Sequence, residues 1–171
     1  MISKGRVWKF GDDINTDLII PGRYLSSYDP AHLAKHAMEG ANKEFAAGVS
    51  QGDLIIAGKN FGCGSSREQA VISLKAAGVS AVIARSFARI FYRNAINLGL
   101  PALVSKDASD VFADGDFALL DSALGLIKSE DGAKQSSTER LPPHIEQILA
   151  AGGLVPLVKS KVHSAGANKR T

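Results

Sequence analysis

The segment Gly58-Lys-Asn-Phe-Gly-Cys-Gly-Ser-Ser-Arg-Glu68 contains residue types that bind small anions and move protons. We expect it to join a buried strand to a helix, the position at which α/β sheets hold ligands. Ser65 and Ser66 are then expected at the start of that helix, where unpaired N–H groups and the helix dipole attract an anion. Arg67 adds a planar guanidinium that suits a carboxylate. This segment, called the glycine loop below, therefore predicts an anion-binding site.

The same residues also allow a purely structural interpretation. Ser65 and Glu68 have the spacing of a capping box, and Gly62 and Gly64 suit a tight turn before a helix. A phosphate site is less well supported, because Lys59 precedes the later glycines and the dinucleotide fingerprint lacks its third glycine. Two serines followed immediately by an arginine favour anion binding, and a carboxylate is the preferred anion.

Asp13-Ile-Asn-Thr-Asp17 is a second polar cluster. It has the composition of an Asx-rich turn, in which side chains bond to their own backbone. Alternatively, it places Thr16 or Asp17 at the rim of the site that the glycine loop forms. Both interpretations stay open on the sequence alone.

Arginines mark a third segment, Ala84-Arg-Ser-Phe-Ala-Arg-Ile-Phe-Tyr-Arg-Asn94, at another predicted strand-to-helix junction. Arg85, Arg89 and Arg93 are four residues apart and would share one helical stripe. Such a stripe is more typical of a solvated or partner-facing surface than of a catalytic one.

Metal and thiol chemistry have weak support in the sequence. Cys63 is the single cysteine, which excludes an internal disulfide and a self-contained cubane cluster, since such a cluster normally requires at least three thiolates. His32 and His36 have the i, i+4 spacing of zinc ligands, but no third ligand is evident nearby, so a surface or packing role is favoured. A nucleophilic role for Cys63 stays a minor alternative, because no histidine is near it in the sequence.

The composition is that of an ordinary globular protein. The chain has 171 residues, of which 45% are hydrophobic and 22% charged, and this fits one domain with a short tail. It lacks an apolar run long enough to span a bilayer, and its N-terminus does not resemble a signal peptide, so we expect a cytoplasmic protein. Residues 159–171 carry four basic residues and no acid, which accounts for the net charge of +3. The nearly neutral remainder argues against a nucleic-acid partner, and we expect residues 159–171 to be a flexible basic tail.

Hydrophobic patterning predicts an α/β fold with a partly parallel sheet. The repeated order of strand and helix over residues 53–104 indicates βαβ units, whose strands are parallel. Loops are predicted over residues 11–17 and 128–140. Strands are predicted over residues 5–10, 53–57, 79–84, 101–104, 117–120 and 124–127, and helices over 29–38, 65–77, 87–97 and 144–150.

Three motifs together resemble the aconitase superfamily. They are Asn15-Thr-Asp-Leu-Ile-Ile-Pro21, Gly62-Cys-Gly-Ser-Ser-Arg-Glu68 and Ser86-Phe-Ala-Arg-Ile-Phe-Tyr-Arg-Asn94, in the order and spacing of that family. Within the superfamily, the chain resembles the stand-alone small subunits of 3-isopropylmalate dehydratase and homoaconitase. The resemblance implies a swivelling β/β/α domain over residues 1–158. It also implies a separate large subunit that carries a [4Fe–4S] cluster.

The resemblance further implies roles for individual residues. Ser65 matches the serine that removes a proton from the carbon beside a carboxylate, and Ser66 and Arg67 match positions that bind substrate carboxylates. Asp17 and Thr16 match the family's Thr-Asp motif and are expected to organise the site. A helix N-terminus and Arg67 would favour the serine alkoxide, whereas a Lewis acid for the leaving hydroxyl must come from the partner.

Substrate specificity is expected to depend on the segment Tyr24-Leu25-Ser26-Ser27. Homoaconitase-like members resemble Tyr-Leu-Arg-Thr at this position, and their arginine would meet an extra substrate carboxylate. Without that cation, the segment favours an uncharged γ substituent such as isopropyl or methyl, since an unpaired buried carboxylate is costly. The residues expected to bind substrate are Gly64, Tyr24, Leu25, Ser26, Ser27, Ser66 and Arg67.

The leading hypothesis is therefore a hydro-lyase small subunit without a cofactor of its own. It would convert 2-isopropylmalate to 3-isopropylmalate by dehydration and rehydration in leucine biosynthesis, and its substrate would be a small dicarboxylate hydroxyacid. A homoaconitase subunit or a methylated-malate dehydratase subunit is a close alternative. A non-catalytic carboxylate-binding module and a hydrolase that uses Cys63 are alternatives of other classes.

Overall fold

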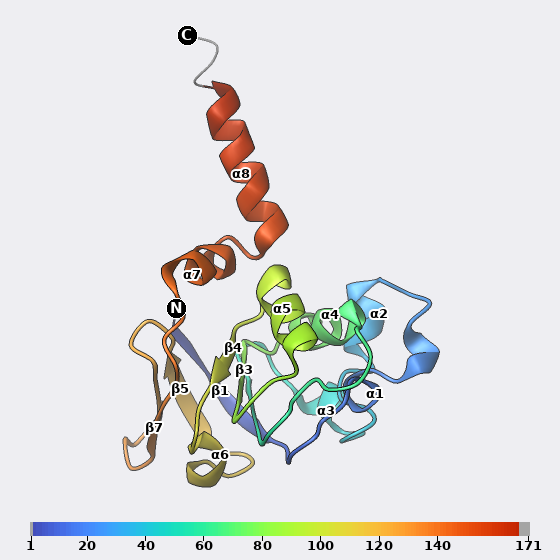
Figure 1. The fold of residues 1–171 in the computed structure, drawn as a ribbon. Coiled ribbons are helices and arrows are strands. Elements are labelled where there is room, and N and C mark those ends of the chain that lie inside the picture. The colour runs from blue at the N-terminus through green and yellow to red at the C-terminus, as the bar shows by residue number, and fades with distance from the viewer. Residues whose placement is uncertain (1, 168–171) are drawn as a thin grey trace.

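Seven strands form one mixed sheet at the centre of the computed structural model, which describes residues 2–167 (Figure 1). The strands are β1 (Ile2–Lys9), β2 (Leu54–Ala57), β3 (Ala81–Ala84), β4 (Ala102–Val104), β5 (Phe117–Asp121), β6 (Leu126–Ser129) and β7 (Gln135–Ser137). Their order across the sheet is β4-β3-β2-β1-β5-β6-β7. The first four pair in parallel, and β5, β6 and β7 extend the sheet by antiparallel pairing. The predicted α/β class with a partly parallel sheet is confirmed.

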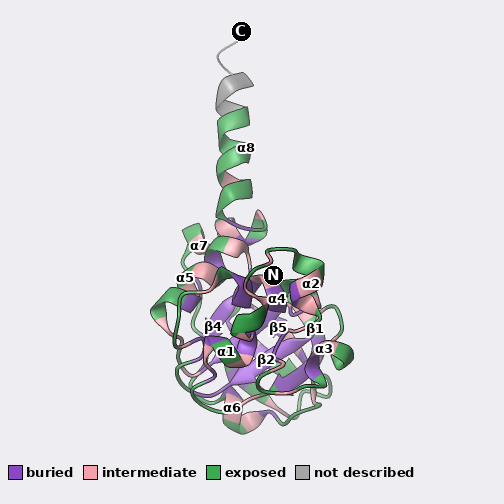
Figure 2. Cartoon of the chain, turned by 90° about the vertical axis from the view of Figure 1, so that its right-hand side faces the viewer, coloured by how far each residue is buried: buried purple, intermediate pink, exposed green. Residues whose placement is uncertain are grey.

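Helices cover both faces of this sheet, and the buried residues concentrate between them (Figure 2). Ile55 of β2 packs with α4 and α5, whereas Leu54 and Ile56 pack with α6 and α7, because side chains alternate along a strand. The helices are α1 (Thr16–Ile19), the 3₁₀ helix η1 (Gly22–Tyr24), α2 (Pro30–Ala34), α3 (Phe45–Gly48), α4 (Glu68–Ala77), α5 (Arg89–Leu98), α6 (Ala108–Val111), α7 (Pro143–Ala150) and α8 (Leu154–Ala167).

Left-handed glycines end the two helices that connect the parallel strands. Gly78, with a φ of 109°, follows α4, and Gly99, with a φ of 77°, follows α5. Each glycine N–H donates to carbonyl groups of the last helical turn. Both ends agree with the sequence prediction to within one residue.

A buried carboxylate fixes β1 against the start of β2. Asp53 is 4% exposed and accepts hydrogen bonds from the N–H of Arg6, the N–H of Ser50 and the indole Nε1–H of Trp8, each at 2.9 Å. Because buried polar groups are costly without partners, these bonds favour one register of the two strands.

Several predicted boundaries are wrong. The helix predicted over residues 29–38 ends at Ala34, and the chain then turns so that Met38, with a φ of 57°, donates its N–H to the Ile19 carbonyl at 2.7 Å. The helix predicted from residue 65 begins at Glu68, and the one predicted from residue 87 begins at Arg89. Part of the predicted loop 128–140 is strand β7, which pairs with β6.

Helix α8 follows α7 and projects beyond the body of the protein (Figure 1). It crosses residue 158, where the sequence placed the end of the domain. The flexibility of residues 159–171 stays a prediction, and residues 168–171 lie outside the described part of the chain. Among the described helices, none is long and apolar enough to cross a membrane.

Candidate functional site

Backbone hydrogen bonds hold the three motif segments side by side at the carboxyl ends of β1, β2 and β3. The Gly58 N–H donates to the Gly11 carbonyl at 3.1 Å, and the Arg85 N–H donates to the Gly58 carbonyl at 3.0 Å. Further along, the Phe61 N–H donates to the Ser86 carbonyl at 3.0 Å. The parallel pairing of the strands thus continues into the loops and places all three motifs at the edge where α/β sheets bind ligands.

The glycine loop crosses the second polar cluster and is bonded to it. The Gly62 N–H donates to the Ile14 carbonyl at 2.7 Å, and the Thr16 N–H donates to the Cys63 carbonyl at 2.9 Å. Gly64 has a φ of 92°, and a Cβ at this position would lie 3.4 Å from the Thr16 Oγ1. Thr16 is 2% exposed, and its Oγ1 has no hydrogen-bond partner among the described residues.

Asp17 and Arg67 form a bidentate ion pair. The Arg67 Nη1 lies 2.6 Å from the Asp17 Oδ1, and the Nη2 lies 3.2 Å from the Oδ2. The Nη1 also donates to the Ile20 carbonyl at 3.3 Å, and the Arg67 side chain is only 14% exposed. The hydrogen bond from Arg67 is the main reason that the pKa of Asp17 is lowered, which keeps this carboxylate ionised.

The ion pair leaves part of the guanidinium available. Three hydrogen bonds use both Nη1 hydrogens and one Nη2 hydrogen of Arg67. The Nε–H and the other Nη2–H have no partner within residues 2–167. These two groups form the side-on fork of a guanidinium, the geometry that binds a second carboxylate.

Ser65 and Ser66 are exposed and precede helix α4 instead of lying in its first turn. The N-cap of α4 is Arg67, which makes no side-chain capping hydrogen bond. The predicted capping box of Ser65 and Glu68 is therefore wrong, as is the placement of both serines at the helix start. The physical reason is that Arg67 is extended, with a φ of −132°, and its side chain turns back to Asp17 before the helix begins.

The predicted specificity segment Tyr24–Ser27 is tied to α4, the helix that follows the glycine loop. The Gln69 Nε2 donates to the Leu25 carbonyl at 3.3 Å. The Ser26 side chain is exposed, and Ser27 is partly buried. The structure therefore places this segment beside α4, whose N-cap is Arg67. Gln69, which makes the contact, was not identified by the sequence analysis.

Glu39 is a second residue that the sequence analysis missed. Its carboxylate accepts a hydrogen bond from the Tyr24 hydroxyl at 3.1 Å and pairs with both Arg23 and the His36 Nδ1. The His36 ring also stacks on Tyr24, with 3.6 Å between ring centroids. The i, i+3 spacing of His36 and Glu39 is the signal that could have identified this cluster.

The arginines of the third motif all line one groove, although only two of them lie on helix α5. Helix α5 begins at Arg89, so Arg85 lies off the helix and bonds to α6, and the predicted single stripe is wrong. Arg85, Arg89 and Arg93 line a groove of about 440 Å³ together with Phe87 and Tyr92. This groove is next to the glycine loop, since Phe87 forms a bridge to that loop.

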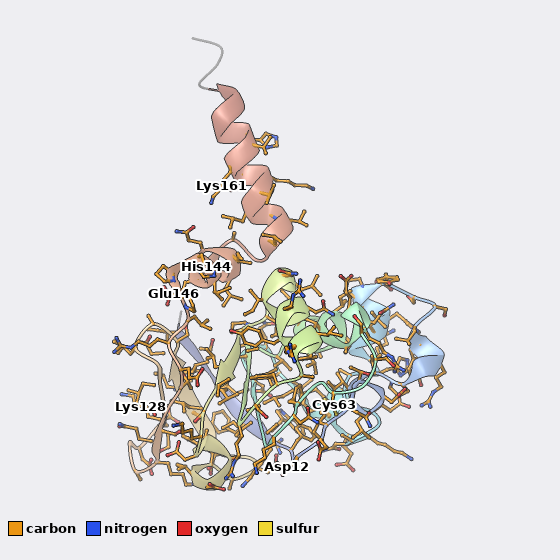
Figure 3. The ribbon with its side chains drawn as sticks, viewed as in Figure 1. Asp12, Cys63, Lys128, His144, Glu146 and Lys161 are labelled. Carbon is orange, nitrogen blue, oxygen red and sulfur yellow. The ribbon has the colours of Figure 1, made fainter. Side chains whose placement is uncertain are left out.

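Candidate metal ligands do not cluster among the residues that the structure describes. In the described part of the chain, no group of three or more His, Cys, Asp or Glu side chains is placed to hold a metal ion. Cys63 is half-buried at the crossing of the two loops (Figure 3). One thiolate does not match the ligand set of a cubane cluster, so the residues present do not fit the [4Fe–4S] cluster that the resemblance implies for the partner.

Comparison with known proteins identifies the class of protein. The family model described as the aconitase C-terminal domain matches residues 12–108, a range that contains all three motifs. A 3-isopropylmalate dehydratase small subunit from Methanopyrus kandleri is 56% identical over 92% of this chain and 93% of the relative. A subunit of the same name from Caldicellulosiruptor saccharolyticus is 51% identical over 95% of this chain and 94% of the relative.

A solved structure agrees with these sequence relatives. The crystal structure of 3-isopropylmalate dehydratase from Methanocaldococcus jannaschii superposes with a TM-score of 0.93 and 49% identity, over 98% of this chain and 99% of that one. The chain belongs to the aconitase C-terminal domain family, and its relatives there are 3-isopropylmalate dehydratase small subunits. The resemblance predicted from the three motifs is confirmed, whereas the roles of single residues stay predictions.

Proposed function

We propose that this chain is the small subunit of a cytoplasmic two-subunit hydro-lyase that interconverts 2-isopropylmalate and 3-isopropylmalate in leucine biosynthesis. The observation that carries the proposal is the exposed Ser65–Ser66 pair, on a glycine loop that is bonded beside the Arg67–Asp17 ion pair. Relatives named as small subunits of this enzyme match nearly the whole chain, which supports the same reaction.

Ser65 is the proposed base. Its Oγ takes the proton from the carbon beside a substrate carboxylate, and the electron pair of that bond forms the double bond as hydroxide leaves the neighbouring carbon. Water then adds back with the opposite regiochemistry and gives the isomer. A serine hydroxyl is a weak base at neutral pH, so its alkoxide requires nearby positive charge. In this proposal the positive potential comes from the unpaired Nε–H and Nη2–H of Arg67, in place of the helix terminus, because Asp17 takes only the other edge of the guanidinium.

Arg67 and Ser66 are the proposed carboxylate ligands. The free Nε–H and Nη2–H of Arg67 form a fork for one substrate carboxylate, while Asp17 holds the opposite edge of the guanidinium. Gly64 permits the turn of the loop before the two serines, because its φ of 92° would strain other residues. Thr16 holds this loop through the hydrogen bond from its N–H to the Cys63 carbonyl.

We assign the [4Fe–4S] cluster to a separate large subunit. The small-subunit names of the relatives support such a partner, and the single thiol of this chain does not fit the cluster. The partner would supply the Lewis acid for the leaving hydroxyl. Proton removal and carboxylate binding are then the contribution of this chain.

The specificity segment supports a substrate with an uncharged γ substituent. The one cation adjoining it, Arg23, pairs with Glu39 and lies over the Tyr24 ring, so its charge is already balanced. Tyr24 is held by Glu39 in turn, and Leu25 is fixed by Gln69. A second γ-carboxylate would therefore find no free cation on this segment, which favours isopropylmalate over homoaconitate.

The decisive experiment is Ser65→Ala, assayed with the large subunit and 2-isopropylmalate. Because general-base catalysis contributes about 10²–10⁴-fold, turnover should fall by that factor while the affinity for the large subunit is retained. Ser137→Ala, at an exposed serine of β7, is the matched control and should keep full turnover. Full turnover by Ser65→Ala would remove Ser65 from the mechanism.

The substrate assignment has its own test. Malate analogues that differ only at the γ position should rank isopropyl and methyl above 2-carboxyethyl in kcat/KM. A preference for the carboxylate-bearing substrate would instead identify a homoaconitase subunit.

A further inference from the structure

Helix α8 presents an apolar face that the chain itself does not cover. Val155, Val158 and Val162 are 62%, 51% and 64% exposed. Their spacing of three and four residues places them on one helical face, in the a, d and a positions of a heptad. We call these three residues the valine seam. Exposed apolar side chains that are grouped in this way mark interaction sites.

The base of α8 is held firmly against the body. A Cβ on Gly99 would lie 2.4 Å from the backbone of Gly152, so the chain before α8 packs directly on the end of α5. The Lys75 Nζ donates to the carbonyls of Leu98 and Gly152, at 2.6 and 3.1 Å, and ties α4 to the same place. The valine seam is therefore presented from a fixed base, and α8 extends away from the sheet in two views (Figures 1 and 2).

The charges beside the valine seam decide what kind of partner it fits. Lys159 and Lys161 occupy the e and g positions that flank the seam, and Lys161 projects from α8 in Figure 3. From Leu154 to the end of the sequence there is no acidic residue. If two copies paired through α8, lysines would face lysines in either orientation, so like charges oppose self-association.

We propose that α8 docks through the valine seam into an apolar groove that is flanked by carboxylates on the large subunit. The choice of the large subunit rests on the proposed function, and the choice of an acidic groove rests on Lys159 and Lys161. The glycine loop lies at the start of α5, where the Ala88 N–H donates to the Phe61 carbonyl at 2.9 Å, whereas the base of α8 packs on the end of α5 at Gly99. The contact would therefore fasten the two subunits without occupying the active site.

Affinity measurements with the full chain and the purified large subunit test this proposal. The double variant Val158→Asp/Val162→Asp should raise the dissociation constant by about tenfold or more, because two carboxylates would replace valines of the seam and face the acidic groove. Lys159→Glu/Lys161→Glu should weaken binding most at low salt, since the like charges are then least screened. Circular dichroism should show that each variant keeps its fold, because all four side chains are exposed.

Two matched controls change exposed side chains outside α8. Leu124→Asp changes a residue that is 60% exposed in the β5–β6 turn, and Lys128→Glu reverses an exposed charge on β6. Both should bind as the unaltered chain does.

Three results would overturn the proposal. Seam variants that bind the large subunit with unaltered affinity would remove α8 from the interface while leaving the proposed function intact. A dimer of the isolated chain that Val158→Asp/Val162→Asp dissociates, with large-subunit binding unchanged, would assign the seam to a second copy. Failure of the unaltered chain to bind any large subunit would end both this inference and the proposed function.

Discussion

At the residue scale, the two hydrogen-bonding sides of the Arg67 guanidinium have different roles. Asp17 and the Ile20 carbonyl take the end of the guanidinium, so the side chain is fixed before any substrate arrives. The remaining fork is thereby oriented for a carboxylate, which lowers the entropic cost of binding. Asp17 is 63% exposed, and we infer that it acts through Arg67 as a positioning residue.

We expect Asp17→Asn to lower kcat/KM for 2-isopropylmalate by about tenfold or more, because Arg67 then loses its ionic partner. The loss should depend on the substrate carboxylate that Arg67 binds. For a substrate ester that lacks this carboxylate, Asp17→Asn should lower kcat/KM far less. Steady-state kinetics of the assembled enzyme with both compounds would measure the difference. Equal losses for the two would contradict the positioning role.

The Asp17–Arg67 pair also predicts a pH dependence of stability. Asp17 has a pKa lowered below its ordinary value of 3.8, so the pair stabilises the fold above that pH and the contribution is lost as the pH falls through the lower, folded-state pKa. Thermal unfolding of the unaltered chain and of Asp17→Asn should therefore differ near neutral pH and converge at strongly acidic pH. The effect should be small, because the carboxylate is mostly exposed.

At the scale of elements, the contact between the end of α5 and the start of α8 depends on glycine. Gly99 and Gly115 both have positive φ angles, 77° and 84°. A Cβ on Gly99 would meet the Gly152 backbone at 2.4 Å, whereas a Cβ on Gly115 would meet nothing within 4 Å. The two positions therefore separate conformational strain from steric exclusion.

Gly115→Ala should lower the free energy of unfolding by about 1–2 kcal/mol, the cost of a left-handed residue with a Cβ. Gly99→Ala should cost about 1–3 kcal/mol more, because two backbone segments must also move apart. Urea denaturation of both variants would give the difference. Equal losses of unfolding free energy in the two variants would mean that the contact between Gly99 and Gly152 accommodates a methyl group at no additional cost.

At the scale of the whole molecule, the stability of α8 should differ from that of the sheet. Isolated helices of this length are marginal in water, and beyond its base α8 carries the exposed valine seam. We expect the amides of residues 159–163 to exchange faster than those of α5 in the isolated chain, and to slow by about tenfold or more in the complex with the large subunit. Hydrogen exchange by mass spectrometry would show this, and equal protection before and after assembly would argue against docking.

The sequence by itself determined the alternating order of strands and helices over residues 53–104 and indicated the chemistry of the glycine loop. Glycines at positions 78 and 99 mark helix ends because a left-handed residue must follow, and that requirement is local. The apolar runs of β2 and β3 read as buried strands for a similarly local reason. The three motifs carried enough information to indicate the family.

Only the tertiary structure decided which polar residues meet. Asp17 and Arg67 are 50 residues apart, and their pairing depends on parallel β1 and β2, which no local pattern encodes. The same long-range pair keeps Arg67 extended and delays α4 to Glu68, so the sequence placed the serines one turn too far into the helix. Strand β7 was missed likewise, because Gln135–Ser137 has no apolar pattern and becomes a strand through pairing with β6. Local conformational preferences depend on neighbouring residues and can be predicted from the sequence. The contacts described here form only once the sheet has brought distant segments together.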